Sequence, residues 1–587
     1  MKPAILILCL VLSLCSCSNG NKLLVEAESL DSLGGWVVDP QFVEQMGSPY
    51  LLAHGMGKIV ENASGRVEFP ESGKYHVWVR TKNWAPGDWD APGKFRLIVD
   101  SKELQVDLGT VEGWTWQYAG RLKVKETVFI QLKDLTGFEG RCDAIYFSSK
   151  KIAPPSAKSS LPKWRRTLTY EPNKTITDEK YDLVIVGGGI AGCAAAIAAA
   201  EMGQQVALIH DRSVLGGNAS SEIRVHTEGV TGDYDRILSM LNTVHWPNGS
   251  PDAVHDDQKR HKNIRKYESI TLYLEWRAYN APTVGDSISC ILAKHTSSGD
   301  LLRLSAPVYI DCTGDGWIGY WAGAEYMYGR EAFTEYDEAW DENGELWSPE
   351  EEDNAVMGSS VLWRTGRADT VSEFPDIVWA KDIVGDFSAT SGTWKWELSS
   401  DTLHQVDDAE IIRDHMFKAI YGSFANAKME EGNENLEMEW MSYLIGKRES
   451  RRLKGDYVFS FRDVVELRRF EDEVAYGVRP VDVHYQQNLV DPIKPDFLSE
   501  ALFYDIDYYY IPFRSLYSKN IKNLMMAGRN FSCTHVGLGG PRVMNTTGQM
   551  GAATGFAAYL CNKYNTYPAG IYKNYIAELK EIIQKQK

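Results

Sequence analysis

A glycine-rich turn between an apolar run and an alanine-rich run constrains the fold of this chain more than any other feature. Residues 181–186 read YDLVIV, Gly187, Gly189 and Gly192 follow with GxGxxG spacing, and residues 193–202 read CAAAIAAAEM. In a strand–turn–helix unit, the first glycine permits the tight turn and the second lets the backbone approach a pyrophosphate. The third glycine lets the helix pack closely on the strand, and the helix N-terminus offers free N–H groups to the anion. The order strand, glycines, helix predicts a dinucleotide-binding α/β unit rather than an unrelated glycine-rich turn.

The acidic residue that usually follows the second strand of such a unit is displaced by one position. The apolar run at residues 206–209 ends on His210, and Asp211 comes next. This acid ordinarily hydrogen-bonds the ribose of the dinucleotide. We expect His210 to make one such bond or Asp211 to reach the ribose instead, with the phosphate site intact.

Three further segments favour FAD over NAD. A second glycine turn follows the second strand, residues 308–316 read VYIDCTGDG, and residues 523–530 read NLMMAGRN ahead of a helix predicted over residues 548–561. The N-terminus of that helix would place its positive dipole end against the flavin ring. The segments and their order are similar to FAD enzymes of the glutathione-reductase type. The residues expected to contact FAD in them are Gly216, Gly217, Asn218, Thr313, Gly314, Asp315, Gly316, Gly528, Arg529, Asn530 and Gly548.

Hydrophobic patterns divide the rest of the chain into domains. Residues 23–150 form short alternating runs separated by Gly, Pro or Asp, which predicts an all-β sandwich of the jelly-roll kind. Residues 151–180 are rich in Ser, Pro and Lys and are expected to be a linker. The α/β FAD-binding domain is expected over residues 181–330 and 516–587. An α+β substrate domain, residues 331–515, is expected to be inserted between these two parts.

The first residues predict export. Residues 4–17 are an apolar run too short to span a bilayer, so residues 1–16 are interpreted as a signal peptide. Residues 14–17, LCSC, resemble a bacterial lipobox that would leave a lipidated Cys17 at the mature N-terminus; the alternative is an ordinary cleaved signal. We expect a protein anchored only by lipid, in the periplasm or at the outer membrane of a bacterium.

Charge and cysteine spacing exclude several functions. The formal net charge of −18 argues against nucleic acid as a partner, because binding a phosphate backbone needs a basic surface. The remaining cysteines do not lie within four residues of one another, so we expect neither a metal nor an iron–sulfur site. They are interpreted as small buried residues rather than as disulfides or redox thiols: Cys142, Cys193, Cys290, Cys312, Cys533 and Cys561.

The N-terminal region resembles the galactose-binding-like jelly rolls that accompany carbohydrate-active enzymes. The residues that carry this resemblance are an EAE strand at residues 26–28 and an Asp-aliphatic-aromatic strand at residues 143–147. Trp84 and Trp89 lie in a polar loop, NWAPGDWDAPG. Their rings are expected either to stack on a sugar or to pack on the neighbouring domain.

Most of the chain resembles the bacterial FAD-dependent oxidoreductase family, whose secreted members are often labelled xanthan lyases. The resemblance rests on LGGNASSEIRVH (215–226), IDCTGDG (310–316), GAEYMYGRE (323–331), GKRESRRLKGDY (446–457), IPFRSLY (511–517), MAGRNFSCTHVGLGGPRVMNTTGQMG (526–551) and DLTGFEGRCDA (134–144). It implies FAD as cofactor. Together with the sugar-binding-like domain, it suggests hydride transfer at flavin N5 from or to a hydroxyl or keto group of a carbohydrate, with an unknown electron acceptor. The alternatives are a glycan-binding surface lipoprotein with a redox-inactive flavin fold and a flavin-assisted lyase or glycosidase.

The reaction requires a base for the hydroxyl proton and cations for a developing oxyanion. His535, in the loop THVGLGGPR before the last helix, is the first candidate for the base, although it could instead satisfy loop carbonyls. His226 and Arg224 follow the second glycine turn and could also reach the ring. His484 could come from the substrate domain, and Arg542 is a candidate clamp for the substrate oxygen.

Overall fold

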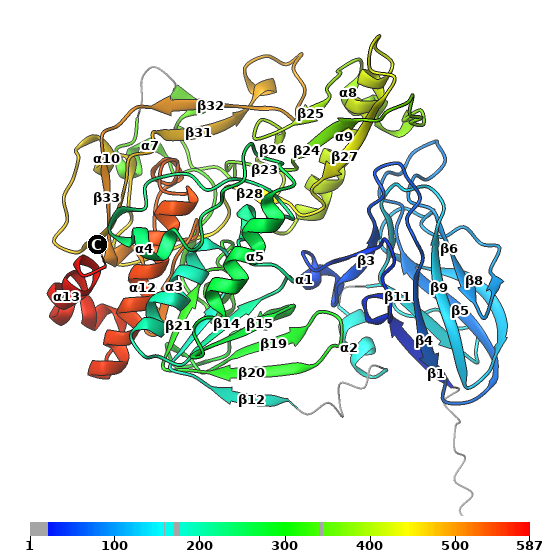
Figure 1. Cartoon of the computed structure of the whole chain (residues 1–587), viewed down its shortest axis with the longest axis horizontal. Coiled ribbons are helices and arrows are strands. Elements are labelled where there is room, and N and C mark those ends of the chain that lie inside the picture. The colour runs from blue at the N-terminus through cyan, green and yellow to red at the C-terminus, as the bar shows by residue number, and fades with distance from the viewer. Residues whose placement is uncertain (1–20, 158, 169–175, 340–343, 587) are drawn as a thin grey trace, which may run out of the picture.

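A five-stranded parallel sheet forms the centre of the α/β part of the chain (Figure 1). The computed structural model describes residues 21–157, 159–168, 176–339 and 344–586. The expected signal peptide and Cys17 therefore lie outside the described residues. Along the sheet the strands are β15 (Ile270–Leu274), β14 (Val206–His210), β13 (Leu183–Val186), β21 (Val308–Asp311) and β34 (Leu524–Met526). β13 lies at the middle, so its carboxyl end and the glycine turn after it meet the ends of β14 and β21.

Two helices pack against each other beside this sheet, α3 (Ile190–Glu201) and α12 (Met544–Tyr564) (Figure 1). Their close approach needs small residues. A Cβ added to Gly551 would lie 2.0 Å from the carbonyl oxygen of Ala191, and one added to Gly555 would lie 2.3 Å from that of Ala195. Both helices begin earlier than predicted, α3 directly after its N-cap Gly189 and α12 directly after Val543. This brings both N-termini to the glycine turns.

Between the nucleotide-binding segments at residues 308–316 and 523–530, the chain forms small antiparallel sheets and one long helix. The helix is α9 (Ala409–Lys428). The strand pairs and triplets used below are β26 (Glu397–Leu398) with β23 (Ser359–Ser360) and β28 (Gly446–Lys447), and β31 (Val481–Gln486) with β32 (Ser499–Tyr504). They place residues from distant parts of the sequence above the carboxyl ends of the central sheet.

The N-terminal region is all-β, as predicted. It forms antiparallel sheets in the order β1-β11-β5-β8, β4-β9-β6-β7 and β10-β3-β2 around its own apolar core. The strands are β1 (Lys22–Glu26), β2 (Val37–Asp39), β3 (Tyr50–Ala53), β4 (Ala63–Glu68), β5 (Gly73–Thr81), β6 (Phe95–Val99), β7 (Lys102–Glu103), β8 (Thr115–Val124), β9 (Thr127–Asp134), β10 (Gly140–Cys142) and β11 (Ala144–Ser148).

The prediction of a linker over residues 151–180 is wrong in part. It contains a helix, α2 (Leu161–Arg166), and an edge strand, β12 (Thr177–Lys180), that pairs with β20 (Leu301–Ser305). Trp164 packs on Trp116 with 5.7 Å between ring centroids, and buried Arg165 lies 3.0 Å from the carboxylate of Asp143. Aromatic packing and a buried ion pair therefore fix a segment whose composition predicted flexibility.

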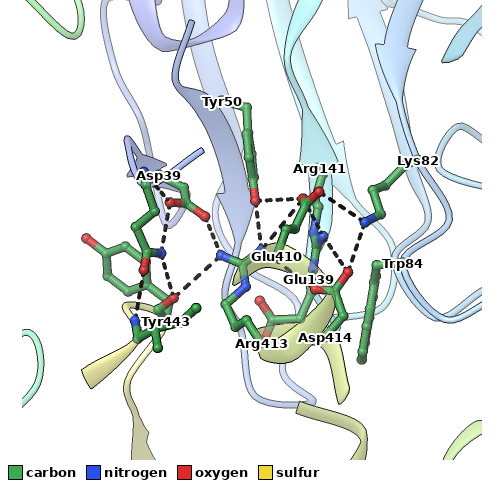
Figure 2. A network of polar contacts seen from close by, with 12 residues as sticks. Asp39, Tyr50, Lys82, Trp84, Glu139, Arg141, Glu410, Arg413, Asp414 and Tyr443 are labelled. Atoms are coloured by element: carbon green, nitrogen blue, oxygen red, sulfur yellow. Dashed lines mark hydrogen bonds and ion pairs between the residues drawn. The ribbon is translucent and has the colours of Figure 1, made fainter. Parts of the chain in front are cut away.

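A buried ionic network joins the N-terminal domain to α9 (Figure 2). Arg141 lies 2.9 Å from Glu410 and also bonds Asp414. Arg413 of α9 donates to the hydroxyl of Tyr50 at 2.7 Å and pairs with Asp39. Both guanidinium groups are fully buried, so the two domains form a single packed body at this interface.

The interface overturns the prediction of a sugar platform at Trp84. Trp84 is only 3% exposed, and its ring meets Trp379 at a centroid distance of 5.1 Å. Trp89 is half-buried against the same apolar cluster, and its indole N–H donates to the carbonyl of Ala85 at 2.8 Å. The second interpretation of this loop, packing on the neighbouring domain, is the one the structure has.

Candidate active site

A cavity of about 500 Å³ lies where the carboxyl ends of the central strands meet the inserted region. This volume is within the range typical of ligand and cofactor sites. Most of the residues expected to contact FAD line it, namely Gly187, Gly189, His210, Asp211, Gly216, Gly217, Asn218, Thr313, Gly314, Asp315, Gly528 and Arg529. The remaining four are not part of the cavity wall: Gly192, Gly316, Asn530 and Gly548. They pack elements instead; a Cβ on Gly192, for example, would lie 1.8 Å from the carbonyl oxygen of Gly187.

The two glycine turns form a cradle that suits a pyrophosphate. Gly187 has φ +109°, and a Cβ there would lie 2.2 Å from the carbonyl oxygen of Cys312. The N–H of Gly216 donates to the carbonyl of Gly188 at 2.9 Å, which holds the turns together. A Cβ on Gly189 would meet only Gly217 Cα, at 3.9 Å, so the backbone is open to a ligand there. The N-terminus of α3 begins at this point and supplies N–H groups to an anion.

The ring of His210 supports the first glycine turn. Its Nδ1 accepts a hydrogen bond from the N–H of Gly188 at 3.1 Å, while its buried Nε2 has no partner among the described residues. Burial, with a contribution from Arg212, lowers the pKa of His210 to about 4, so the ring is neutral and Nε2 carries the hydrogen. Asp211, by contrast, is held by Arg277 at 2.7 Å.

A buried carboxylate, Asp315, organises the segment at residues 308–316. Asp315 lies 2.7 Å from Lys447 and 2.7 Å from Arg529, and it accepts a hydrogen bond from Ser450 at 2.8 Å. Burial alone would raise the pKa of Asp315, but the two cations hold it well below its usual value. The carboxylate thereby fixes Lys447 and Arg529, which both line the cavity. The glycine cradle and these cations fit a dinucleotide cofactor.

Another part of the cavity wall carries a histidine–carboxylate pair. His484 on β31 donates from Nδ1 to Glu397 of β26 at 2.7 Å, and Arg448 lies 3.1 Å from the same carboxylate. His484 and Arg448 line the cavity, as do Arg542 and Trp394. The first residues of α12 line it too, so the positive end of that helix dipole faces the same space.

This pair holds His484 in the form of a base. Burial would raise the pKa of Glu397, but Arg448 and His484 lower it well below its usual value, so Glu397 is ionised. Burial also lowers the pKa of His484, partly offset by Glu397, so the ring is neutral near pH 7. Because Nδ1 donates its hydrogen to Glu397, Nε2 carries the lone pair. The geometry therefore supplies a proton acceptor at the cavity.

His226 lines the cavity but is less suited to this role. Its Nε2 lies 3.1 Å from Glu228 and its Nδ1 bonds Asn248. The hydrogen bond to Glu228 raises the pKa of His226 despite burial, so the proton is retained to higher pH. Both ring nitrogens are already engaged.

Two of the predicted catalytic residues do not line the cavity, and these predictions were wrong. His535 is 2% exposed and begins α11 (His535–Leu538), with Nδ1 bonded to Glu449 at 2.8 Å. Arg224 packs its guanidinium on the ring of Trp440 at 4.2 Å and donates to the carbonyl of Gly249. Both side chains are turned away by partners that are distant in sequence.

Several residues at the site had not been predicted as functional. They are Lys447, Arg277, Arg479 and Trp317, which line the cavity, and Glu397 and Asp482, which pair with its histidine and arginines. Only the polar run GKRESRR around Lys447 gave a sequence signal. The others come from β-strands, from a loop and, in the case of Trp317, from the start of a helix, and none belongs to a motif.

Over residues 21–157, 159–168, 176–339 and 344–586, no group of three or more His, Cys, Asp and Glu could hold a metal ion. In that same part of the chain all six cysteines are buried and none forms a disulfide. No helix among the described residues is long and apolar enough to cross a membrane.

Comparison with known proteins agrees with the site. The model of a family described as FAD dependent oxidoreductase matches residues 182–583. A structure of a geranylgeranyl bacteriochlorophyll reductase-like protein from Thermoplasma acidophilum is 12% identical, covers 70% of this chain and 84% of its own, and has a TM-score of 0.30. A quinol fumarate reductase FrdA from E. coli is 13% identical over 70% of this chain and 74% of its own, with a TM-score of 0.27. A family 35 carbohydrate binding module from Clostridium thermocellum is 19% identical over 22% of this chain and 98% of its own, with a TM-score of 0.18. No curated protein matches the sequence.

Proposed function

Because the chain belongs to the FAD dependent oxidoreductase family, with FAD as its cofactor, we propose that it oxidises or reduces a hydroxyl or keto group of a carbohydrate. The observation that carries the proposal is the His484–Glu397 pair beside Arg448 and Arg542 in the cavity that holds the glycine turns. FAD supplies a hydride acceptor or donor when bound. The chain supplies the proton chemistry and the charge.

In the oxidative direction His484 Nε2 takes the proton of the substrate hydroxyl. Glu397 fixes the ring through Nδ1 and stabilises the imidazolium that forms. Arg542 pairs with Asp482 and lines the cavity, where its charge stabilises the oxygen as it becomes a carbonyl. In the reductive direction His484 returns the proton to the same oxygen.

Aromatic rings support a sugar as substrate. Trp394 lines the cavity, with its ring centroid 5.3 Å from that of His484. Trp246 is 71% exposed and lies 4.4 Å from the ring of His226, which also lines the cavity. An exposed indole next to a polar cavity suits a pyranose, which presents an apolar face and polar edges.

Three further assignments are part of the proposal: the type of FAD domain, the jelly-roll fold of the N-terminal domain, and export with lipidation. The order of the nucleotide-binding segments supports a domain of the glutathione-reductase type, and the antiparallel sheets of residues 22–148 support a jelly roll.

Export and lipidation at Cys17 rest on the apolar leader and on residues 14–17. Metabolic labelling with a fatty acid should mark the parent and miss Cys17→Ala; equal labelling of both would refute the anchor.

The substrate class is tested by anaerobic reduction of the FAD-loaded protein. We expect at least one member of a panel of neutral sugars, uronic acids and their oligosaccharides to bleach the visible absorbance of the flavin. If no member bleaches it and a glycan still binds, the protein is a redox-inactive glycan binder. If a glycan is cleaved without consumption of an electron acceptor, the flavin-assisted lyase or glycosidase is correct instead.

A further inference from the structure

The N-terminal β domain contributes directly to the cofactor cavity. Pro40, Gln41 and Phe42, at the end of β2, line the same cavity as Gly187–Ala191 of the first glycine turn. A short helix, α1 (Val43–Met46), follows at once and carries Glu44. One wall of the nucleotide site therefore comes from a domain whose sequence carries no nucleotide-binding motif.

Gln41 fixes the opposite wall through hydrogen bonds. Its side-chain oxygen accepts from the N–H of Ile445 at 2.8 Å, and its side-chain nitrogen donates to the carbonyl of Tyr443 at 3.1 Å. The residues that follow, including Ile445 and Lys447, line the cavity. Gln41 thus links the N-terminal domain to the backbone that presents Lys447.

Glu44 continues a chain of charges to the ribose end of the site. Its carboxylate lies 2.8 Å from Nη2 of Arg277, and Nη1 of Arg277 lies 2.7 Å from Asp211. Burial lowers the pKa of Arg277, but Glu44 and Asp211 raise it above its usual value overall, so the arginine stays charged. Asp211 follows β14, the position from which dinucleotide-binding folds contact the ribose.

The loop at residues 40–44 has a rigid base. Asp39 directly precedes it, is fully buried and pairs with Arg413 of α9 within the interdomain network (Figure 2). Asp39 also accepts a hydrogen bond from the side chain of Gln41 at 3.0 Å. Docking of the domain on α9 therefore sets the position of the loop.

We propose that residues 40–44 are a positioning segment of the FAD site. The N-terminal domain acts as a fixed clamp over the ribose end, and the Glu44–Arg277–Asp211 chain slows the release of FAD. The inference depends on FAD as cofactor and not on the sugar substrate, so it can fail or succeed independently of that proposal.

The test measures the rate of FAD release from the full-length loaded protein, followed as the rise in flavin fluorescence after dilution. We expect Glu44→Gln to release FAD severalfold faster, because glutamine removes the negative charge that faces Arg277 while it can still accept a hydrogen bond. Lys82→Gln is the matched control. Lys82 also crosses the domain interface and lies 2.9 Å from Asp414, but its carboxylate partners belong to α9 and do not line the cavity.

Salt provides a second readout. Raising the ionic strength should speed release from the parent more than from Glu44→Gln, because the interaction of Glu44 with Arg277 can be screened only in the parent. Release at the parental rate in Glu44→Gln would overturn the proposal. An equal acceleration in Lys82→Gln would also overturn it, since domain docking in general, rather than the clamp, would then control FAD.

Discussion

Replacing His484 with glutamine should slow reduction of the bound flavin by about 10²–10⁴-fold, the usual contribution of a positioned general base. Glutamine removes the proton acceptor, while its amide can still donate to Glu397. FAD content and thermal stability should therefore stay close to those of the parent. The measurement is stopped-flow bleaching of the flavin under anaerobic conditions, with the panel sugar that reduces the parent fastest.

His415→Gln is the matched control. His415 on α9 also pairs with a carboxylate, Asp496 at 2.9 Å, but it does not line the cavity. We expect its reduction rate to equal that of the parent. Unchanged bleaching in His484→Gln would show that the proton goes to another group and would refute the proposed base.

Replacing Arg141 with methionine should destabilise the chain by about 3–5 kcal/mol, the cost of breaking a buried pair by removing one partner. Methionine retains much of the apolar stem but leaves Glu410 and Asp414 without their main buried cation (Figure 2). Urea unfolding followed by tryptophan fluorescence measures the effect. Arg96→Met is the control, since Arg96 pairs with Glu103 and Asp107 at the surface of the same domain and should cost about 1 kcal/mol or less.

The pH dependence of stability gives an independent check on this network. Burial would raise the pKa of Asp414, but Arg141 and Lys82 lower it overall below its usual value. A carboxylate with a lowered pKa in the folded state stabilises the protein above its unfolded pKa, about 3.9, and loses that effect as pH falls further. Between about pH 4 and pH 7 the parent should thus keep its advantage over Arg141→Met. A cost of under about 1 kcal/mol at pH 7 would show that the network does not hold the domains together.

The nucleotide-binding segments could be predicted from sequence because their determinants are local. Gly187 needs a positive φ, and Gly192 must be small because it packs against Gly187 five residues away. Such requirements appear in the sequence as glycines at fixed spacings within a few residues. His210 is different: it was expected to contact the ribose, but its Nδ1 accepts from Gly188, 22 residues away, through the pairing of adjacent parallel strands.

The side chains around the substrate could not be predicted in this way because their directions depend on distant partners. His535 was expected to face the flavin, but Glu449 and Glu331 hold it in the core. For Trp84 the sequence left open whether the ring stacks on a sugar or packs on the neighbouring domain, and only the position of Trp379 decides for packing. His484 becomes a candidate base only through Glu397, which lies on another strand and has no motif.

We propose that the cavity is a redox site with His484 as its base. The pH dependence of flavin reduction is the measurement that decides whether this is correct. The pKa of His484 lies below the usual 6.5 of histidine, so the base form should prevail at neutral pH. We expect a reduction rate that is constant near and above about pH 7 and falls only at a pH below the usual 6.5 of histidine, with this acid limb absent in His484→Gln. An identical acid limb in the parent and in His484→Gln would contradict it.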